Sequence, residues 1–345
     1  MTTGKMGRIA VIGGGGWGTA LAVHLAKKGG DVSIWVREPE VAEQIGRDRE
    51  NKQFLPGVPI PNVVRVTTDL EKALVGAPAI VVMAVPTHGI RGVLGRMSGL
   101  VKNAVFVSVA KGFEVETLKR PSEVIGELTG TDSGQICIIS GPSHAEEVGR
   151  GVPTAVVAAC SSQETADTVQ KAFFSPRFRV YTHSDTLGVE LGGALKNIIA
   201  IACGIGDGLG FGDNTRAMLM TRGLAEMTRL GIALGARRET FQGLAGLGDL
   251  IVTCGSELSR NRKLGIRIGR GESLDNILSG MKQVAEGVKA CQGAFKLAKD
   301  RDVVMPITQQ LHGILFEGRQ PQTALEGLLS REMRSEEEGG LRTGR

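Results

Sequence analysis

The chain has 345 residues, which is enough for about two domains with well-buried cores. Hydrophobic residues make up 41% and charged residues 22% of the sequence, and these values exclude a wholly disordered chain. The net charge is +5, but basic and acidic side chains are interspersed, so we expect no nucleic-acid partner.

Short apolar runs alternate with helical patterns in the first half of the chain. The runs contain Val, Ile and Ala along nearly their whole length, which is typical of strands buried on both faces. Strands that alternate with helices predict right-handed crossovers and a mostly parallel sheet. The predicted strands are Arg8–Ile12, Val32–Val36, Val63–Thr67, Ala79–Val85, Ala104–Val109, Ile136–Ser140, Thr154–Ala159 and Arg177–Tyr181, and the helices include Gly16–Lys28, Thr87–Met97 and Pro142–Gly149.

Long helical patterns dominate after about Asp185, so we expect a domain boundary near this point. Glycine-rich segments such as Gly204–Gly212 are interpreted as turns between the helices. The charged, glycine-containing tail at residues 331–345 is expected to be disordered. The predicted helices are Leu187–Ala202, Thr215–Leu234, a segment after Ser259, Gly287–Lys299 and Thr308–Phe316.

Two further observations bear on where the protein works. No stretch reaches the ~18 consecutive apolar residues of a membrane-spanning helix, and the short polar segment Met1–Met6 does not resemble a signal peptide. The 5 cysteines lack C-x-x-C spacing, which is typical of buried, reduced thiols. We therefore expect a cytoplasmic protein without membrane insertion.

A glycine-rich turn, Gly13-Gly14-Gly15-Gly16-Trp17-Gly18, follows the first predicted strand and opens the first predicted helix. It fits the pattern G-x-G-x-x-G, with Gly13, Gly15 and Gly18 at the pattern positions. Gly13 permits a tight turn, Gly15 lets the backbone approach a pyrophosphate, and Gly18 lets the helix pack on the strand. The N-terminus of the helix then offers N–H groups to phosphates. The alternative is an ordinary turn in a chain with 50 glycines, but the surrounding strand–helix units favour a dinucleotide site.

The predicted fold class is therefore α/β, a Rossmann-type, mostly parallel sheet domain followed by an all-helical C-terminal domain. We interpret residues 1–187 as a dinucleotide-binding domain and residues 188–330 as a helical substrate-binding domain.

The residue that ends the second strand bears on the choice of cofactor. An acidic residue usually stands there, about 20 residues after the glycines, and binds the ribose 2′-hydroxyl. Here Trp35-Val36 is followed by Arg37 and then Glu38. A cation suits a 2′-phosphate, so Arg37 favours NADP, or the use of both NADP and NAD with a preference for NADPH. The alternative is an arginine that is only solvated at the surface.

Several blocks of sequence then occur together in one order. They are Gly18-Thr19-Ala20-Leu21, Ala110-Lys111-Gly112, Ser140-Gly141-Pro142-Ser143, Leu195-Lys196-Asn197, Gly246-Leu247-Gly248-Asp249, Ser259-Arg260-Asn261 and Glu286-Gly287. From about Arg8 to about Phe316, the chain resembles the bacterial NAD(P)-dependent glycerol-3-phosphate dehydrogenase family. Jointly these blocks are highly specific, whereas any one of them alone is not.

The resemblance implies reversible reduction of dihydroxyacetone phosphate to sn-glycerol 3-phosphate, which feeds phospholipid synthesis. It implies that Lys196 is the catalytic proton-transfer residue. The implied cofactor contacts, besides the three pattern glycines, are Gly16, Trp17, Arg37, Lys111, Ala145, Arg260, Val284 and Glu286. The implied substrate contacts are Lys111, Gly141, Ser143, Lys196, Asp249, Ser259, Arg260 and Asn261. The chain departs from the family's usual residues at His144 and Ala285, and neither change removes a group that the reaction needs.

The chemistry of these residues fits the implied reaction. A ketone that gains electrons develops negative charge on its oxygen, which requires a proton donor or a cation there. Lys196 lies in an otherwise apolar helical segment, where a lysine is costly unless it is paired, functional or able to reach solvent. Asp249 is expected in a loop and could pair with Lys196, although an ordinary helix cap would also explain it. Lys111 ends a parallel strand at the edge where such sheets bind ligands, or is simply solvated.

Ser259-Arg260-Asn261 is expected to begin a helix, with Ser259 as its N-cap. Backbone N–H groups, a hydroxyl, an amide and a guanidinium would then converge on an anion such as a substrate phosphate. The alternative is a plain helix start followed by two further basic residues. The histidines are scattered, and no metal-binding cluster is predicted.

Two alternative functions are considered. A β-hydroxyacid or phosphogluconate dehydrogenase, an enzyme of the same class, also combines a dinucleotide fold with a helical domain and a catalytic lysine, but the blocks Gly246-Leu247-Gly248-Asp249 and Ser259-Arg260-Asn261 argue against it. A nucleotide-sensing binding protein without catalysis would be expected to lack Lys196, Asp249 or Arg260, and all of them are present. A homodimer is consistent with apolar helices exposed in the second domain.

Overall fold

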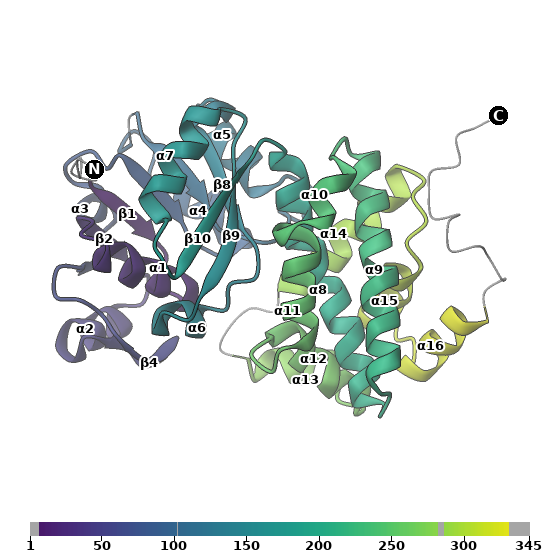
Figure 1. The fold of residues 1–345 in the computed structure, drawn as a ribbon. Helices are drawn as coiled ribbons and strands as arrows, with labels where there is room; N and C mark the ends of the chain where they lie inside the picture. Colours follow the sequence, from purple (N-terminus) through teal and green to yellow (C-terminus); the bar gives the residue numbers. More distant parts are fainter. Residues whose placement is uncertain (1–6, 102, 282–285, 331–345) are drawn as a thin grey trace. The chain divides into compact units, whose positions relative to one another are not determined.

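The computed structural model describes residues 7–101, 103–281 and 286–330, which form two compact units (Figure 1). The first unit extends to Ala110 and resumes as Lys119–Thr186. The second comprises Lys111–Leu118 and the chain from Leu187 onward. The predicted tail at residues 331–345 lies outside the described residues.

An eight-stranded sheet forms the centre of the first unit, in the order β10-β9-β8-β7-β6-β1-β2-β5. Neighbouring strands are parallel except β8 and β9, which confirms the predicted mostly parallel sheet. The strands are β1 (Ile9–Ile12), β2 (Val32–Trp35), β5 (Arg65–Thr67), β6 (Ile80–Met83), β7 (Val105–Ser108), β8 (Ile136–Ser140), β9 (Thr154–Ala159) and β10 (Phe178–His183).

Both faces of this sheet are buried, which explains why its strands are apolar along their length. In β1, Ile9 and Val11 belong to one apolar core, whereas Ala10 and Ile12 belong to another on the opposite face. The first core includes side chains of α1 (Gly16–Lys27), α2 (Pro39–Asp48), α6 (Ala145–Arg150) and α7 (Gln163–Phe173). The second includes side chains of α3 (Leu70–Leu74), α4 (Thr87–Arg96) and α5 (Pro121–Thr129).

The glycine-rich turn lies where the direction of chain winding reverses. β1 pairs with β2 on one side and with β6 on the other, and ligands of such sheets bind at the carboxyl ends of the strands at this point. A short hairpin of β3 (Glu50–Asn51) and β4 (Leu55–Pro59), which was not predicted, supports the turn from outside. Buried Asn51 donates hydrogen bonds to the Gly14 carbonyl at 2.8 Å and to Thr19 Oγ1 at 2.9 Å.

The second unit is helical, and its core is built around the long helix α8 (Thr186–Gly208). Its other helices are α9 (Asp213–Ala233), α10 (Arg238–Gln242), the π-helical turn η2 (Leu244–Gly248), α11 (Asp249–Gly255), α12 (Arg260–Gly269), α13 (Leu274–Ser279), α14 (Glu286–Asp300), α15 (Pro306–Phe316) and α16 (Pro321–Leu329). By length and composition α8 would also suffice to cross a membrane, but 94% of its most apolar window is buried inside the protein. That burial is the behaviour of a core helix.

The predicted turn at Gly204–Gly212 is wrong in its first part. Helix α8 continues through Gly204 to Gly208, and α9 begins after Gly212. The backbone of α12 (Arg260–Gly269) packs against Gly204 and Gly208, so a Cβ at either glycine would overlap a carbonyl oxygen of Arg262 or Ile266. Close packing between helices, rather than a turn, accounts for these glycines.

The segment Lys111–Leu118 departs from the predicted domain division, which assigned residues 1–187 to the first domain. It groups with the helical unit because Phe113 is buried in the core of that unit. A Cβ on Gly293 of α14 would lie 3.3 Å from the Phe113 ring, which shows how closely the two elements pack. The other boundary falls between Thr186 and Leu187.

Candidate active site

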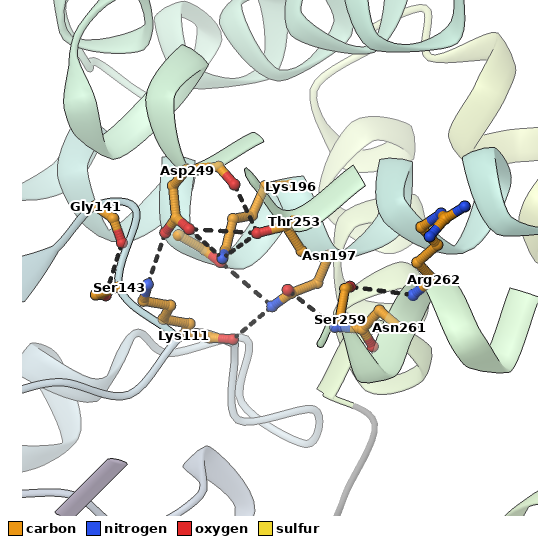
Figure 2. A network of polar contacts seen from close by, with 11 residues as sticks. Lys111, Gly141, Ser143, Lys196, Asn197, Asp249, Thr253, Ser259, Asn261 and Arg262 are labelled. Carbon is orange, nitrogen blue, oxygen red and sulfur yellow. Dashed lines mark hydrogen bonds and ion pairs between the residues drawn. The ribbon is translucent and has the colours of Figure 1, made fainter. Parts of the chain in front are cut away.

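Two lysines share one buried carboxylate in the helical unit (Figure 2). Lys196 Nζ of α8 lies 2.5 Å from Asp249 Oδ1, and Lys111 Nζ lies 2.6 Å from Asp249 Oδ2. Lys196 also donates a hydrogen bond to Thr253 Oγ1 at 2.7 Å, while that hydroxyl donates to the Asp249 carbonyl at 2.6 Å. The structure thus shows the pairing of Lys196 with Asp249 that the sequence suggested, and adds Lys111 and Thr253 to it.

Burial controls the charges in this group. The side chain of Lys196 is 7% exposed, so it does not reach out to solvent, and that of Asp249 is 1% exposed. Burial, together with the Lys111 charge, lowers the pKa of Lys196 to about 8 against the opposing effect of the Asp249 carboxylate. Burial alone would raise the pKa of Asp249, but the two lysines outweigh it and hold that pKa below its usual range. The lysine can therefore exchange a proton near neutral pH.

Asp249 is the first residue of α11 rather than part of a loop, which corrects the sequence prediction. The preceding turn η2 packs directly on α8, where a Cβ at Gly192 would lie 2.5 Å from the carbonyl oxygen of Ala245. Glycine at this position therefore lets η2 approach closely enough for Asp249 to meet Lys196.

Buried asparagines connect this group to two further elements. Asn197 Nδ2 lies 3.3 Å from the Lys111 carbonyl oxygen, and Asn261 Nδ2 donates to Asn197 Oδ1 at 2.9 Å. The backbone N–H of Gly287 then donates to Asn261 Oδ1 at 3.1 Å. Sequence reasoning assigned Asn261 to the substrate and gave Asn197 no role, because no spacing indicates that two asparagines 64 residues apart will meet. In the structure both amides fix the elements around the lysines.

The N-terminus of α12 carries the predicted phosphate-binding residues. Ser259 is the N-cap, as predicted, and its Oγ accepts a hydrogen bond from the Arg262 backbone N–H at 3.2 Å. Ser259 is buried, whereas Arg260 is exposed at the first position of the helix. A capped helix start with an accessible guanidinium is suited to an anionic ligand.

The glycine-rich turn of the first unit fits a dinucleotide pyrophosphate. Gly13 has φ of +123°, and a Cβ there would lie 2.6 Å from the Ala84 carbonyl oxygen. Gly18 lies against the Gly13 backbone, whereas a Cβ at Gly15 would meet open space. Gly15 is also the N-cap of α1. In the described chain, no side chain caps the N-terminus of this helix, and its first turn contains no acidic residue. The tight turn, the close packing and the open approach match the three glycine roles.

Gly16, Trp17 and Ala145 lie beside this turn. A Cβ on Gly16 would lie 2.7 Å from the Phe54 carbonyl oxygen and 3.6 Å from the Ala145 methyl group. Trp17, Phe54 and Ala145 all pack against the same core. The buried indole Nε1 of Trp17 has no hydrogen-bond partner within residues 7–101, 103–281 and 286–330. Phe54 was not predicted, since it lies in an irregular segment between β3 and β4.

Arg37 follows β2 and is strongly exposed. Its side chain is 75% exposed, and its Nη2 lies 2.5 Å from Glu38 Oε1. The guanidinium is thus accessible and is paired with the neighbouring carboxylate. Glu286 begins α14, next to the Gly287 N–H that binds Asn261. The predicted contact Val284 and the family departure Ala285 lie outside the described residues.

Gly141 and Ser143 follow β8 in the first unit. Gly141 has φ of +134°, and Ser143 Oγ donates a hydrogen bond to the Gly141 carbonyl at 2.8 Å. A Cβ at Gly141 would lie 3.1 Å from the Val156 Cα of β9, and this close contact and the positive φ together favour glycine. The predicted site residues therefore form two groups, one in each unit. In the helical unit these are Lys111, Lys196, Asp249, Ser259, Arg260, Asn261 and Glu286, and in the first unit Gly13, Gly15, Gly16, Trp17, Gly18, Arg37, Gly141, Ser143 and Ala145.

Comparison with family models matches both units of the chain. Residues 8–166 match the N-terminus of NAD-dependent glycerol-3-phosphate dehydrogenase, and residues 185–326 match its C-terminus. Together the two matches cover most of the sequence.

Individual relatives give the same result. The chain is 53% identical over 327 residues to a glycerol-3-phosphate dehydrogenase [NAD(P)+] from Pelotomaculum thermopropionicum, covering 94% of this chain and 93% of that protein. It is 49% identical to one from Thermoanaerobacter, covering 96% and 99%. A crystal structure of glycerol-3-phosphate dehydrogenase from Coxiella burnetii superposes with a TM-score of 0.90 at 38% identity, covering 94% of this chain and 99% of that one.

Proposed function

The chain belongs to the NAD-dependent glycerol-3-phosphate dehydrogenase family, and from this premise we propose that it reduces dihydroxyacetone phosphate to sn-glycerol 3-phosphate, reversibly, with NADPH or NADH. The observation that carries the proposal is the pair of lysines on the buried carboxylate of Asp249, next to a capped helix start that suits a phosphate. The product would supply the backbone of glycerophospholipids.

The glycine-rich turn would hold the cofactor pyrophosphate, with Gly13, Gly15 and Gly18 in the roles described above and Gly16, Trp17 and Ala145 beside them. When bound, the nicotinamide cofactor supplies the two electrons and one of the two hydrogens that convert a ketone to an alcohol. The other proposed contacts with the cofactor are Arg37, Lys111, Arg260, Val284 and Glu286.

Lys196 is the proposed proton donor. As the substrate oxygen gains negative charge, the Lys196 ammonium donates a proton to it and becomes a neutral amine. Asp249 and Thr253 hold Nζ in place, at 2.5 Å and 2.7 Å. Lys111 shares the same carboxylate and is more exposed, with 16% of its side chain accessible, so it is suited to orienting the substrate by charge. A nearby cation also favours the neutral amine after transfer.

The substrate phosphate would bind at the N-terminus of α12. Backbone N–H groups, the Ser259 hydroxyl and the Arg260 guanidinium provide donors there, and the helix dipole favours an anion. Gly141 and Ser143 are proposed as further substrate contacts from the first unit. Fixing the phosphate would position the ketone for reaction at Lys196.

The function is tested by mixing the pure protein with NADPH and dihydroxyacetone phosphate and following the absorbance of the reduced nicotinamide. We expect rapid oxidation of NADPH, and glycerol 3-phosphate with NADP+ should drive the reverse change. A β-hydroxyacid or 6-phosphogluconate as substrate should give no activity. Absence of turnover with dihydroxyacetone phosphate, with either cofactor, would reject the proposal.

We also propose that the enzyme works in the cytoplasm, without membrane insertion or a nucleic-acid partner, and as a homodimer. The 5 cysteines are all free and buried, which suits a reducing compartment. In the helical unit, Met218 and Phe316 are among the large apolar side chains that stay exposed. Light scattering at micromolar concentration distinguishes a dimer from a monomer.

Arg37 is proposed to bind the adenosine 2′-phosphate. Arg37→Glu should therefore raise the KM for NADPH by ~10-fold or more, since charged hydrogen bonds contribute about 1.5–3 kcal/mol. The KM for NADH, which lacks this phosphate, should stay nearly unchanged. Arg47→Glu is a matched control, because Arg47 is also strongly exposed and paired with the next residue, Asp48. The ratio of the two KM values, measured for wild type and both variants, checks the prediction. If the ratio of the KM values for NADPH and NADH in Arg37→Glu equals that of wild type, Arg37 does not bind the 2′-phosphate.

A further inference from the structure

Helices α8 and α12 touch along their backbones. On each helix two glycines four residues apart face the partner, and a Cβ on any of them would overlap a carbonyl oxygen of the other helix. These glycines are Gly204 and Gly208 on α8 and Gly265 and Gly269 on α12. We call this contact the glycine seam. Glycines allow two helices to approach closely, but they provide no side-chain ridges to fix how one helix slides or turns on the other.

At the active-site end of the glycine seam, the two helices carry the groups that the reaction needs. Lys196 lies on α8, and Arg260 is the first residue of α12. The Asn261–Asn197 hydrogen bond of 2.9 Å joins the helices there (Figure 2). The distance between Lys196 and the phosphate site therefore depends on the position of α12 relative to α8.

Farther along α8, the carboxylate of Asp207 joins three helices. Its Oδ2 accepts a hydrogen bond from Arg262 Nε of α12 at 2.7 Å, and its Oδ1 accepts from Arg216 Nη2 of α9 at 2.8 Å. The Asp207 and Arg262 side chains are 10% and 14% exposed, so solvent screens this pair only weakly. Two guanidinium groups on separate oxygens give the carboxylate a fixed orientation.

Arg262 connects this ion pair to the phosphate site. Its side chain binds Asp207, while its backbone N–H binds the cap hydroxyl of Ser259 at 3.2 Å. Arg262 is thus held at both ends within the first turn of α12. A shift of its guanidinium would move the turn that presents Ser259, Arg260 and Asn261.

We propose that Asp207 is a positioning residue for the substrate phosphate, which fixes the first turn of α12 relative to Lys196 by holding Arg262 across the glycine seam. This inference rests on the proposed function. Asp207 is not among the proposed contacts with substrate or cofactor. It acts on the phosphate site through Arg262, while Arg216 of α9 holds the other carboxylate oxygen.

The test uses Asp207→Asn in the full-length enzyme, which keeps the size of the side chain and removes its charge. We expect the KM for dihydroxyacetone phosphate to rise ~10-fold, because a displaced first turn of α12 would weaken its hydrogen bonds to the charged phosphate. The kcat/KM for unphosphorylated dihydroxyacetone, which does not use the phosphate site, should stay within about twofold of wild type. The Kd for NADPH, measured by fluorescence titration, should be unchanged.

Asp213→Asn is the matched control. Asp213 also binds Arg216, at 2.7 Å, but its side chain is 92% exposed and does not contact Arg262 in the described structure. We expect wild-type values for both ketones in this variant. Arg262→Lys is the second test variant, since it keeps a cation beside Asp207 but loses the directional fork of the guanidinium. It should raise the KM for dihydroxyacetone phosphate several-fold. If Asp207→Asn does not fold, this variant alone tests whether the Asp207–Arg262 pair positions the phosphate site.

A merely structural role predicts a different result, because loss of folded protein lowers the rate with both ketones equally. Equal losses, or an unchanged KM for dihydroxyacetone phosphate in the folded variants, would overturn the positioning role. Either result leaves wild-type activity intact, whereas failure of the proposed function appears as an inactive wild type.

Discussion

Lys196→Met is expected to lower kcat for dihydroxyacetone phosphate by ~10²-fold or more, the usual scale of general acid–base catalysis. Methionine fills a similar volume without a transferable proton, so the developing charge on the substrate oxygen would lose its donor. Asp249 would keep one cation, because Lys111 Nζ still lies 2.6 Å from its Oδ2. The fold and the glycine-rich turn should therefore survive the change.

Steady-state rates and the Kd for NADPH check this prediction. We expect the Kd to match wild type, since Lys196 is not among the proposed contacts with the cofactor. Lys111→Met is the informative comparison, as it removes the second lysine on the same carboxylate. Turnover of Lys196→Met within a few-fold of wild type, together with a large loss in Lys111→Met, would transfer the role of acid to Lys111.

Arg260→Ala is expected to lower kcat/KM for dihydroxyacetone phosphate. The loss should correspond to about 3 kcal/mol of transition-state stabilisation, on the scale of charged hydrogen bonds. The phosphate is the only strong charge on the substrate, so losing its anchor should misplace the ketone at Lys196. Arg260→Lys should recover part of the loss, because an ammonium cannot bind phosphate through two parallel hydrogen bonds.

Arg267→Ala provides the control on the same helix, since Arg267 lies in the last turn of α12 and pairs with Glu272 at the surface. Its kinetic constants should match wild type. Unphosphorylated dihydroxyacetone should react poorly with wild type and with Arg260→Ala alike. If Arg260→Ala penalises both ketones equally, then Arg260 serves the cofactor or the fold instead of the phosphate.

Local patterns were sufficient to predict the sheet. Runs of Val, Ile and Ala such as Ile136–Ser140 identify strands buried on both faces, and the structure has a strand with those bounds. The antiparallel pairing of β9 with β8 was not predictable, because nothing in the residues between them specifies the direction of return. The short hairpin that supports Gly14 through Asn51 likewise depends on a contact between distant segments.

The chemistry of the site was partly predictable. A lysine in the apolar segment around Lys196 signals a paired or functional group, and Ser259 before a basic helix signals a cap. The shared use of Asp249 by two lysines depends on folding Lys111 into the helical unit, which the sequence pattern placed in the sheet domain. Gly204 was misread as a turn because its partner, α12, lies far along the chain. The four-residue spacing of the glycines on each helix does not identify which distant segment packs against them.

The pH dependence of the two reaction directions tests the central role of Lys196 most directly. The pKa of Lys196 is lowered to about 8, mainly by burial, so the ammonium form needed for reduction is lost as pH rises through that value. We predict that kcat/KM for dihydroxyacetone phosphate falls ~10-fold per pH unit above about pH 8. The rate of glycerol 3-phosphate oxidation, which needs the neutral amine, should rise over the same range and then level off. A reduction rate that stays constant from about pH 7 to about pH 9.5 would contradict Lys196 as the proton donor.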